Sequence, residues 1–346
     1  MKIRFIISVL CASFILCAGE SYNFYMISDT HFGTAESYNQ DPATPKRMRT
    51  KKDIHRADKA MPLYRAMFAD MAKKADKDTR FIVHGGDMIE GLTKGAQVHQ
   101  EQLENAIKLM QEYFKLPIYA VNGNHDAVGF GGREGYQKGL ISYLSKITGK
   151  QLQTTNYSVK CGGDLYIFID RYDRGHFKFI QQTLAEQKSK PRYLFIILHT
   201  DDVMPFYTEG QKRYFDLLSP YNAIVLHGHT HTAMMLHVDN AGKSVTSFSL
   251  GTYLEPQPER NRYNGLDTNL DAPQISRRAK TPERTAYFAK EFRPNLKVYK
   301  NFSKSKKGAK FQGYAKISVS DEGIKVMMQS GDLSQEPINF DLRPAK

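Results

Sequence analysis

Aspartate, asparagine and histidine side chains occur in five short clusters between residues 29 and 231. The clusters are Asp29 with His31, Asp87, Asn124 with His125 and Asp126, His199, and His229 with His231. Carboxylate and amide oxygens combined with imidazole nitrogens suit Mn, Fe, Zn or a similar transition metal. Their number exceeds the four donors that a single tetrahedral zinc ion uses, and it fits two ions that share a carboxylate. The residue types therefore predict a dinuclear metal centre.

Each cluster follows a short apolar run that is rich in branched or aromatic residues. The runs are FYMIS, FIVHGG, IYAVNG, YLFIIL and AIVLHG. Segments with helical spacing lie between them, at about residues 61–74, 98–114, 137–147, 176–187 and 211–218. This alternation indicates βαβ units and a sheet covered by helices. Because ligands of such sheets bind at the carboxyl ends of strands, we expect all five clusters to share one site.

The order of the clusters resembles the motif pattern of the calcineurin-like metallophosphoesterase superfamily. The motifs D-x-H, G-D, G-N-H-D, a single H and G-H-x-H occur in that order over about residues 23–253. Any one of them is weak evidence, but all five in order, each at a strand end, are specific. The resemblance implies an α/β fold, a four-layer αββα sandwich of two mixed β-sheets flanked by helices.

The resemblance also implies a role for each site residue. The first ion would be bound by Asp29, His31 and His231, and the second by Asn124, His199 and His229. Asp87 would bridge both ions. His125 would face the leaving group, and Asp126 would orient His125. No ligand position departs from the family pattern, which favours an active enzyme.

The expected reaction is hydrolysis of a phosphate mono- or diester. Two divalent ions can clamp a phosphate, and a water held between them loses a proton readily. The resulting metal-bridging hydroxide would attack phosphorus in line, and His125 would act as general acid. The substrate would be a small molecule or a phosphoprotein. The core motifs do not choose among these, because specificity lies in the surrounding loops.

The first 19 residues have the layout of a signal peptide. Lys2 and Arg4 precede an apolar run from Phe5 to Cys17, and the small residues Ala18 and Gly19 follow. The run is shorter than the roughly 20 residues of a transmembrane helix, and no later segment approaches that length. We therefore expect an exported, periplasmic or extracellular protein with one metallophosphoesterase domain over residues 20–346. Removal of this segment would leave Cys161 without an intrachain disulfide partner.

Positive charge is concentrated in two segments outside the motifs. The formal net charge is +13. Residues 277–310 contain twelve Lys or Arg and two Glu, and residues 46–59 contain seven Lys or Arg and two Asp. They fall in basic insertions expected at about 34–60 and 255–310, which precede a predicted C-terminal hairpin at 313–329. Such segments attract nucleic acid, phosphorylated molecules or an anionic membrane surface, or they are simply solvated.

Two alternative functions use these basic segments. One is a secreted nuclease, and the other is a polyanion-binding protein with little catalysis. The complete ligand set argues against the second, whereas the sequence does not exclude the first. Arg133 is a weaker candidate for holding a substrate phosphate. Asp201 and Asp202 are expected at a helix N-cap or in a solvated loop, and the alternative is that they are partners of ligand imidazoles. Three further histidines are interpreted as structural: His84, His227 and His237.

Overall fold

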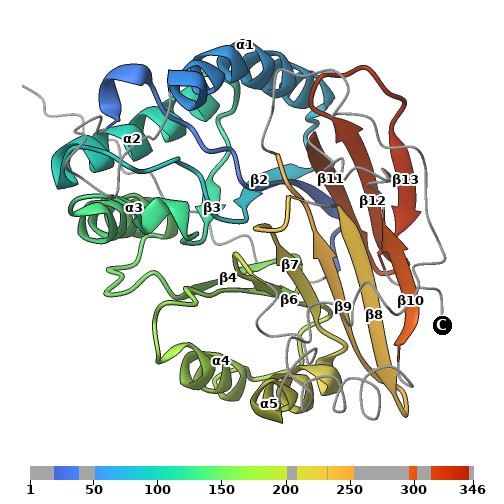
Figure 1. Cartoon of the computed structure of the whole chain (residues 1–346). Coiled ribbons are helices and arrows are strands. Elements are labelled where there is room, and N and C mark those ends of the chain that lie inside the picture. Colours follow the sequence, from blue (N-terminus) through green and yellow to red (C-terminus); the bar gives the residue numbers. More distant parts are fainter. Residues whose placement is uncertain are drawn as a thin grey trace, which may run out of the picture.

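The computed structural model describes residues 19–38, 51–200, 209–231, 233–252, 296–301 and 313–342. Two β-sheets pack face to face, with helices on both outer sides (Figure 1). This arrangement confirms the predicted αββα sandwich. Residues 39–50 of the first basic insertion, most of the second and nearly all of the expected signal peptide lie outside the described residues. Within those residues, no helix is long and apolar enough to span a membrane.

The first sheet has six strands in the order β13-β12-β11-β1-β2-β3. Their bounds are β1 Tyr22–Ile27, β2 Thr79–His84, β3 Ile118–Ala120, β11 Gly313–Ser320, β12 Gly323–Ser330 and β13 Ile338–Asp341. Strands β1, β2 and β3 are parallel, whereas β11 pairs antiparallel with β1. The hairpin expected near residues 313–329 is formed by β11 and β12, and it extends the same sheet.

The second sheet has seven strands in the order β10-β8-β9-β7-β6-β5-β4. Their bounds are β4 Tyr157–Cys161, β5 Asp164–Phe168, β6 Leu194–Ile197, β7 Ile224–His227, β8 Met234–Asn240, β9 Lys243–Ser249 and β10 Leu296–Asn301. Strands β5, β6, β7 and β9 are parallel, and the others pair antiparallel. Strand β10 lies within the segment that was expected to be an insertion, where it forms a sheet edge.

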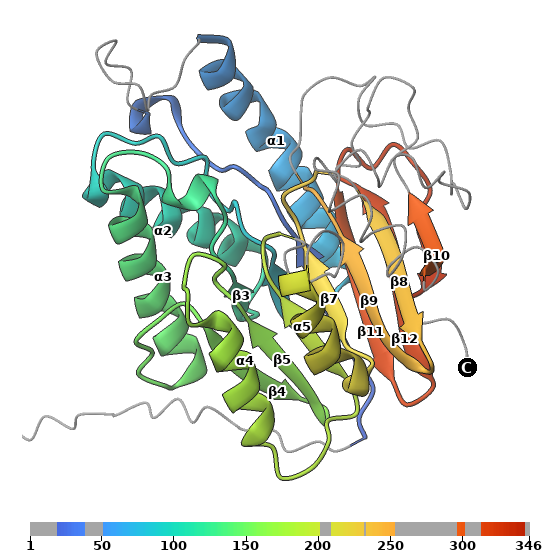
Figure 2. The same ribbon diagram turned by 60° about the horizontal axis from the view of Figure 1, so that its bottom comes forward.

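Helices α1 (Lys51–Lys74), α2 (Ala96–Tyr113) and α3 (Gly132–Thr148) lie on the side of the six-stranded sheet. Helices α4 (His176–Ala185) and α5 (Glu209–Leu218) lie on the other side, against the seven-stranded sheet (Figure 2). Side chains of a strand alternate between faces, so β5 contributes to two apolar layers. Leu165 and Ile167 pack with α4 and α5, while Tyr166 and Phe168 belong to the larger core cluster.

Aromatic side chains join the two sheets at their centre. The ring of Phe24 on β1 makes edge contacts with Tyr166 and Phe195 of the second sheet, at centroid distances of 5.6 and 5.9 Å. Tyr166 and Phe195 stack on each other at 4.5 Å. Such contacts add to the stabilisation from burial and fix one sheet relative to the other. The parallel strands of both sheets are thereby held as a rigid base for the loops at their carboxyl ends.

Candidate metal centre

The predicted ligands follow the carboxyl ends of five parallel strands, β1, β2, β3, β6 and β7. Several of them have backbones in the left-handed region, where residues other than glycine are uncommon. The φ angles are 57° for Asp29, 47° for His31, 50° for Asp87, 68° for His229 and 51° for His231. Each such conformation costs on the order of 1–3 kcal/mol and typically occurs at functional sites. The strand-to-loop turns are therefore strained in order to aim these side chains inward.

Glycines make this close approach possible. A Cβ atom at Gly123 would collide with the backbone and carboxylate of Asp87, and one at Gly228 would collide with Ser28 and Asp29. Gly86 has a φ of 91°, which favours glycine directly. The glycines of the G-N-H-D and G-H-x-H motifs are thus required by packing around the two carboxylates, and the glycine of the G-D motif by its backbone conformation.

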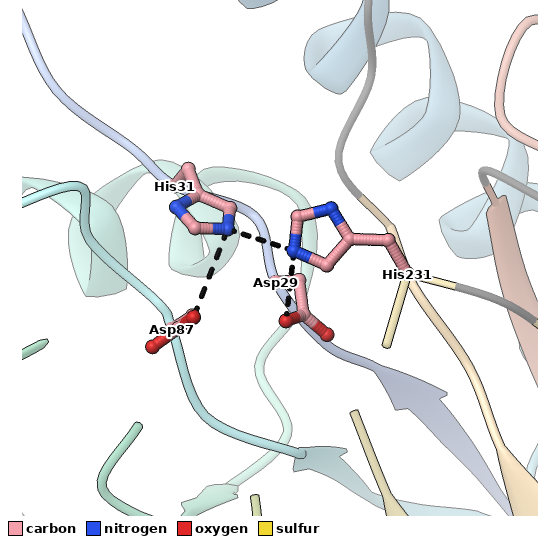
Figure 3. A group of neighbouring side chains, drawn as sticks. All are labelled: Asp29, His31, Asp87 and His231. Atoms are coloured by element: carbon pink, nitrogen blue, oxygen red, sulfur yellow. Dashed lines mark hydrogen bonds and ion pairs between the residues drawn. The ribbon is translucent and has the colours of Figure 1, made fainter. Parts of the chain in front are cut away.

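One group of four donors is formed by Asp29, His31, Asp87 and His231 (Figure 3). The Nε2 atoms of His31 and His231 are 3.2 Å apart. His31 Nε2 lies 3.8 Å from Asp87 Oδ2, and His231 Nε2 lies 3.2 Å from Asp29 Oδ1. All four donor atoms lie within 4.8 Å of one another. Two imidazoles and two carboxylates converging in this way are a suitable set for a transition-metal ion.

A second group contains Asp87, His199 and His229, again with donor atoms within 4.8 Å of one another. His199 Nε2 is 3.1 Å from Asp87 Oδ2 and 3.1 Å from the amide oxygen Oδ1 of Asn124. The rings of His199 and His229 are edge to face with centroids 5.0 Å apart. Asp87 therefore belongs to both groups, which is the position expected of a bridging ligand.

Hydrogen bonds behind two histidines direct their Nε2 atoms into the site. His199 Nδ1 lies 2.9 Å from the carbonyl oxygen of Gly85, and His31 Nδ1 lies 2.7 Å from Glu90 Oε2. A proton on each Nδ1 satisfies these acceptors, so each Nε2 faces the acceptors around Asp87. His199 faces three acceptor oxygens, one from Gly85 at Nδ1 and two from Asp87 and Asn124 at Nε2. A proton or a metal cation is therefore required between Nε2 and the last two oxygens. Burial lowers the pKa of His199, but Asp87 outweighs burial and raises it to about 9.

The carboxylate of Asp29 is fully buried and accepts three hydrogen bonds. The backbone N–H of His229 lies 2.9 and 3.0 Å from its two oxygens, and the Ser28 hydroxyl donates to Oδ2 at 2.7 Å. Burial opposes ionisation, yet His231 and His199 hold the pKa of Asp29 below its usual range. Asp29 is therefore an anion at neutral pH, as a metal ligand must be.

His125 of the G-N-H-D motif is partly exposed, and its partner differs from the expected one. Its ring lies edge to face with His31 at 4.5 Å. His125 Nδ1 is 3.3 Å from Glu90 Oε1 and 3.4 Å from the Glu90 carbonyl oxygen. Burial lowers the pKa of His125, but Glu90 raises it to about 9. His125 is thus cationic at neutral pH, as a proton donor requires.

Asp126 holds backbone in place, whereas we expected it to orient His125. Its carboxylate accepts hydrogen bonds from the N–H groups of Ile89 at 3.0 Å and Gly123 at 2.8 Å. Burial raises the pKa of Asp126 to about 7. The structure therefore revises this expectation: Asp126 joins the loops after β2 and β3, and Glu90 contacts the imidazole.

Glu90 is a residue of this site that the sequence analysis missed. It contacts the ring nitrogens of both His31 and His125. Burial raises the pKa of Glu90, but these two histidines outweigh burial and hold it at about 2. The available signal was its position three residues after Asp87, on the same turn. An acidic residue so close to a ligand is a natural partner for an imidazole.

The histidines interpreted as structural are buried and hydrogen-bonded. His84 contacts the Thr30 hydroxyl at 3.1 Å, His227 the Ser247 hydroxyl at 3.0 Å and His237 the Thr246 hydroxyl at 2.9 Å. Burial lowers the pKa of His84 to about 3, so this ring is neutral. Asp201 and Asp202 lie outside the described residues. Arg133 donates to the carbonyl oxygen of Tyr172 at 3.2 Å.

A family model described as calcineurin-like phosphoesterase matches residues 22–233, which include all five motifs. The chain belongs to the calcineurin-like phosphoesterase family. Membership confirms the resemblance found in the sequence and supports a metal-dependent phosphoester hydrolase. Divalent metal ions are used in this family, and the converging donors described above are groups that could bind them.

Solved structures that resemble this chain have distant sequences. The match with the structure of PhoD covers 94% of this chain and 69% of the PhoD chain, with a TM-score of 0.51 and 11% identity. The match with a dimetal phosphatase from Danio rerio covers 93% of this chain and 99% of the phosphatase chain, with a TM-score of 0.49 and 11% identity. A search of the curated proteins gave no match by sequence. At 11% identity the likeness to PhoD concerns the fold alone.

Proposed function

We propose that this protein is an exported dinuclear-metal phosphoesterase that hydrolyses phosphate mono- or diesters. The main support is the carboxylate of Asp87, which lies between two groups of donors and is shared by both. A single metal ion would leave one of these groups without a role. Two ions with a common carboxylate use every donor of these two groups.

The described donors fit such a centre by number and type. The ions would be held by Asp29, His31 and His231 on one side, by Asn124, His199 and His229 on the other, and by Asp87 between them. When bound, divalent ions offset the charge of a phosphoryl group and lower the pKa of a nearby water. The protein contributes fixed positions, because Glu90 and the Gly85 carbonyl orient the imidazoles of His31 and His199.

His125 supplies the proton for the leaving group in this proposal. Its ring is beside His31 but, with 34% of its side chain exposed, it remains accessible to a substrate. Glu90 holds Nδ1, which leaves Nε2 to donate to the departing oxygen of the ester. The same cationic ring attracts a phosphate before the reaction begins.

The decisive experiment is a panel of phosphate mono- and diesters, including DNA and RNA, assayed with Mn, Zn, Fe and Mg. We expect turnover of at least one small ester, and His125→Ala should reduce it about a hundredfold. Metal content should stay near two ions per chain in that variant. Absence of turnover with every metal would contradict the proposal, and full activity of His125→Ala would remove His125 from the mechanism. Turnover of polymers alone would select the nuclease alternative.

Export is a second part of this proposal. The support is the charged start at Lys2 and Arg4 followed by an apolar run and small residues. Expression of the full chain with a C-terminal tag should place the mature protein outside the cytoplasm, with a new N-terminus near residue 20. A cytoplasmic product that retains Met1 would contradict it.

A further inference from the structure

A third group of donors shares His31 with the metal centre but lies on the other side of its ring. The group consists of His31, Glu90 and His125, and its donor atoms lie within 4.8 Å of one another. The Nε2 atom of His31 faces Asp87 and His231, whereas its second ring nitrogen points away from them (Figure 3). That nitrogen, Nδ1, contacts Glu90. No other proposed ligand belongs to this group, and the proposed reaction assigns no ion to it.

The two oxygens of the Glu90 carboxylate have different contacts. Oε2 lies 2.7 Å from His31 Nδ1, which is the length of a charge-assisted hydrogen bond. Oε1 lies 3.3 Å from His125 Nδ1, and the Glu90 carbonyl oxygen lies 3.4 Å from the same nitrogen. Hydrogen bonds between charged nitrogen and oxygen groups are about 2.7–2.9 Å long. A shared proton therefore fits between Glu90 and His31, whereas the space beside His125 Nδ1 is wider than a proton requires.

The separations around His125 Nδ1 match those between the ligands of a metal ion. Zinc binds nitrogen and oxygen at about 2.0–2.2 Å with tetrahedral angles, so two of its ligands lie about 3.3–3.6 Å apart. The distances from His125 Nδ1 to Glu90 Oε1 and to the Glu90 carbonyl oxygen, 3.3 and 3.4 Å, fall in this range. An imidazole nitrogen and two oxygens are suitable donors for zinc or a similar transition metal. Water would complete the coordination.

This position is partly buried and can be reached from solvent on the His125 side. The side chain of His125 is 34% exposed and that of Glu90 is 17% exposed, whereas His31 is only 4% exposed. A partly buried carboxylate attracts a cation more strongly than an exposed one, because water screens it less. Only two residues supply the three donors. An ion would therefore bind here more weakly than at the two groups that share Asp87.

We propose that Glu90 and His125 form a weak site for a third divalent transition-metal ion, and that its occupation inhibits the enzyme. This inference rests on the proposed phosphoesterase function, in which His125 donates the proton. The ion would be bound by His125 Nδ1, Glu90 Oε1 and the Glu90 carbonyl oxygen, while His31 keeps its hydrogen bond to Glu90 Oε2. An imidazole that binds an ion through one nitrogen is no longer an imidazolium, and it releases its other proton much less readily. Activity would therefore fall when metal exceeds two ions per chain.

The test is equilibrium dialysis of the protein against increasing zinc, with turnover of a small phosphate ester measured on the same samples. The wild-type protein should bind two ions first and a third at zinc concentrations about tenfold higher or more. Turnover should rise until two ions are bound, and it should fall by about tenfold or more as the third binds, because a general acid is lost.

His125→Ala is the main variant, because His125 is not a ligand of the first two ions. It should retain two ions and lose the third, and its residual turnover should not fall in excess zinc. Glu90→Gln should also weaken the third ion. His176→Ala and Glu134→Gln are matched controls, since each replaces the same residue type outside the three groups of donors. Both should bind the third ion as the wild-type protein does.

Absence of a third ion in the wild-type protein, or its equal loss in the two controls, would overturn the site. Binding of a third ion with unchanged turnover would overturn its inhibitory role while the phosphoesterase function stands. Lack of turnover with every metal would overturn the phosphoesterase function and with it the inhibition, whereas the dialysis would still decide whether the site exists.

Discussion

Buried carboxylates lie at both ends of the parallel strands, and their partners differ. Asp164 begins β5, at the end away from the metal centre. Its carboxylate accepts from Arg192 Nε at 3.0 Å and Nη2 at 2.8 Å, from the Tyr193 N–H at 2.9 Å and from the Tyr22 hydroxyl at 2.7 Å. Asp87, at the other end, accepts from the His125 N–H at 2.7 Å and otherwise faces imidazole nitrogens.

The partners decide which buried carboxylate is structural. An arginine is always protonated, so the charge of Asp164 is always compensated and requires no metal ion. A histidine neutralises Asp87 only while it carries a proton, and that proton can be exchanged for a metal ion. The backbone conformation also distinguishes the two ends. Asp29, His31 and Asp87 have left-handed backbones, whereas Asp164 does not. Burial alone therefore does not identify a functional carboxylate. Burial beside histidines, whose protons can be replaced by a metal ion, does.

The largest effect is expected for Asp87→Ala. Loss of the shared carboxylate removes a donor from both groups, so bound metal should fall strongly at both positions. Activity should fall by about a thousandfold or more, at the top of the range for one lost transition-state contact. Metal analysis and turnover on the same folded sample would check this. Retention of two ions per chain would show that Asp87 does not bridge.

At the opposite end, Asp164→Ala should reduce stability and leave metal binding intact. Removing one partner of a buried ion pair costs about 3–5 kcal/mol, because Arg192 is left without its main acceptor. Arg192 also contacts Asp321 at 2.6 Å, which places the expected loss in the lower part of that range. Denaturant unfolding gives the free energy. Lost metal in the folded fraction of this variant would contradict the distinction between the two ends.

An intermediate effect is expected for Glu90→Gln, which removes charge but retains shape. Activity should fall about 10- to 100-fold, as for other residues that orient metal ligands. Glu90 raises the pKa of His125, so without its carboxylate the ring loses its proton at lower pH. The alkaline limb of the kcat/KM profile should therefore move to lower pH. An unchanged limb would mean that another group sets it.

The smallest effect concerns the stability of metal-free protein. The pKa of His199 is about 9 in the folded state and near 6.5 when unfolded. Because the pKa is raised in the folded state, protonated His199 contributes its full stabilisation below pH 6.5. This contribution is lost as the pH rises through 9. Metal-free protein should lose about 1–3 kcal/mol across this range. Thermal unfolding at several pH values measures the loss, and metal-loaded protein or Asp87→Asn should show less of it.

Local patterns in the sequence were sufficient to predict most of the fold and the residues that converge at the strand ends. Apolar runs and helical spacing depend on neighbours in the chain, and they predicted the parallel strands and the helices between them. The rule that ligands bind at strand ends brought Asp29, Asp87 and His229 to one edge. The side-chain partner of His125 could not be predicted in this way. The order of the motifs suggested Asp126, whereas the turn after β2 places Glu90 beside the His125 ring.

By itself, the sequence determined the residue types that converge, because each motif is a short turn whose glycines and polar residues are adjacent in the chain. Only the tertiary structure decided which groups lie behind them. Glu90 reaches two imidazoles, Asp126 joins two loops, and Asp170 holds the loop after β5 through contacts with residues 15 to 48 positions away. Such contacts depend on how strands are placed side by side, and no local pattern encodes that placement.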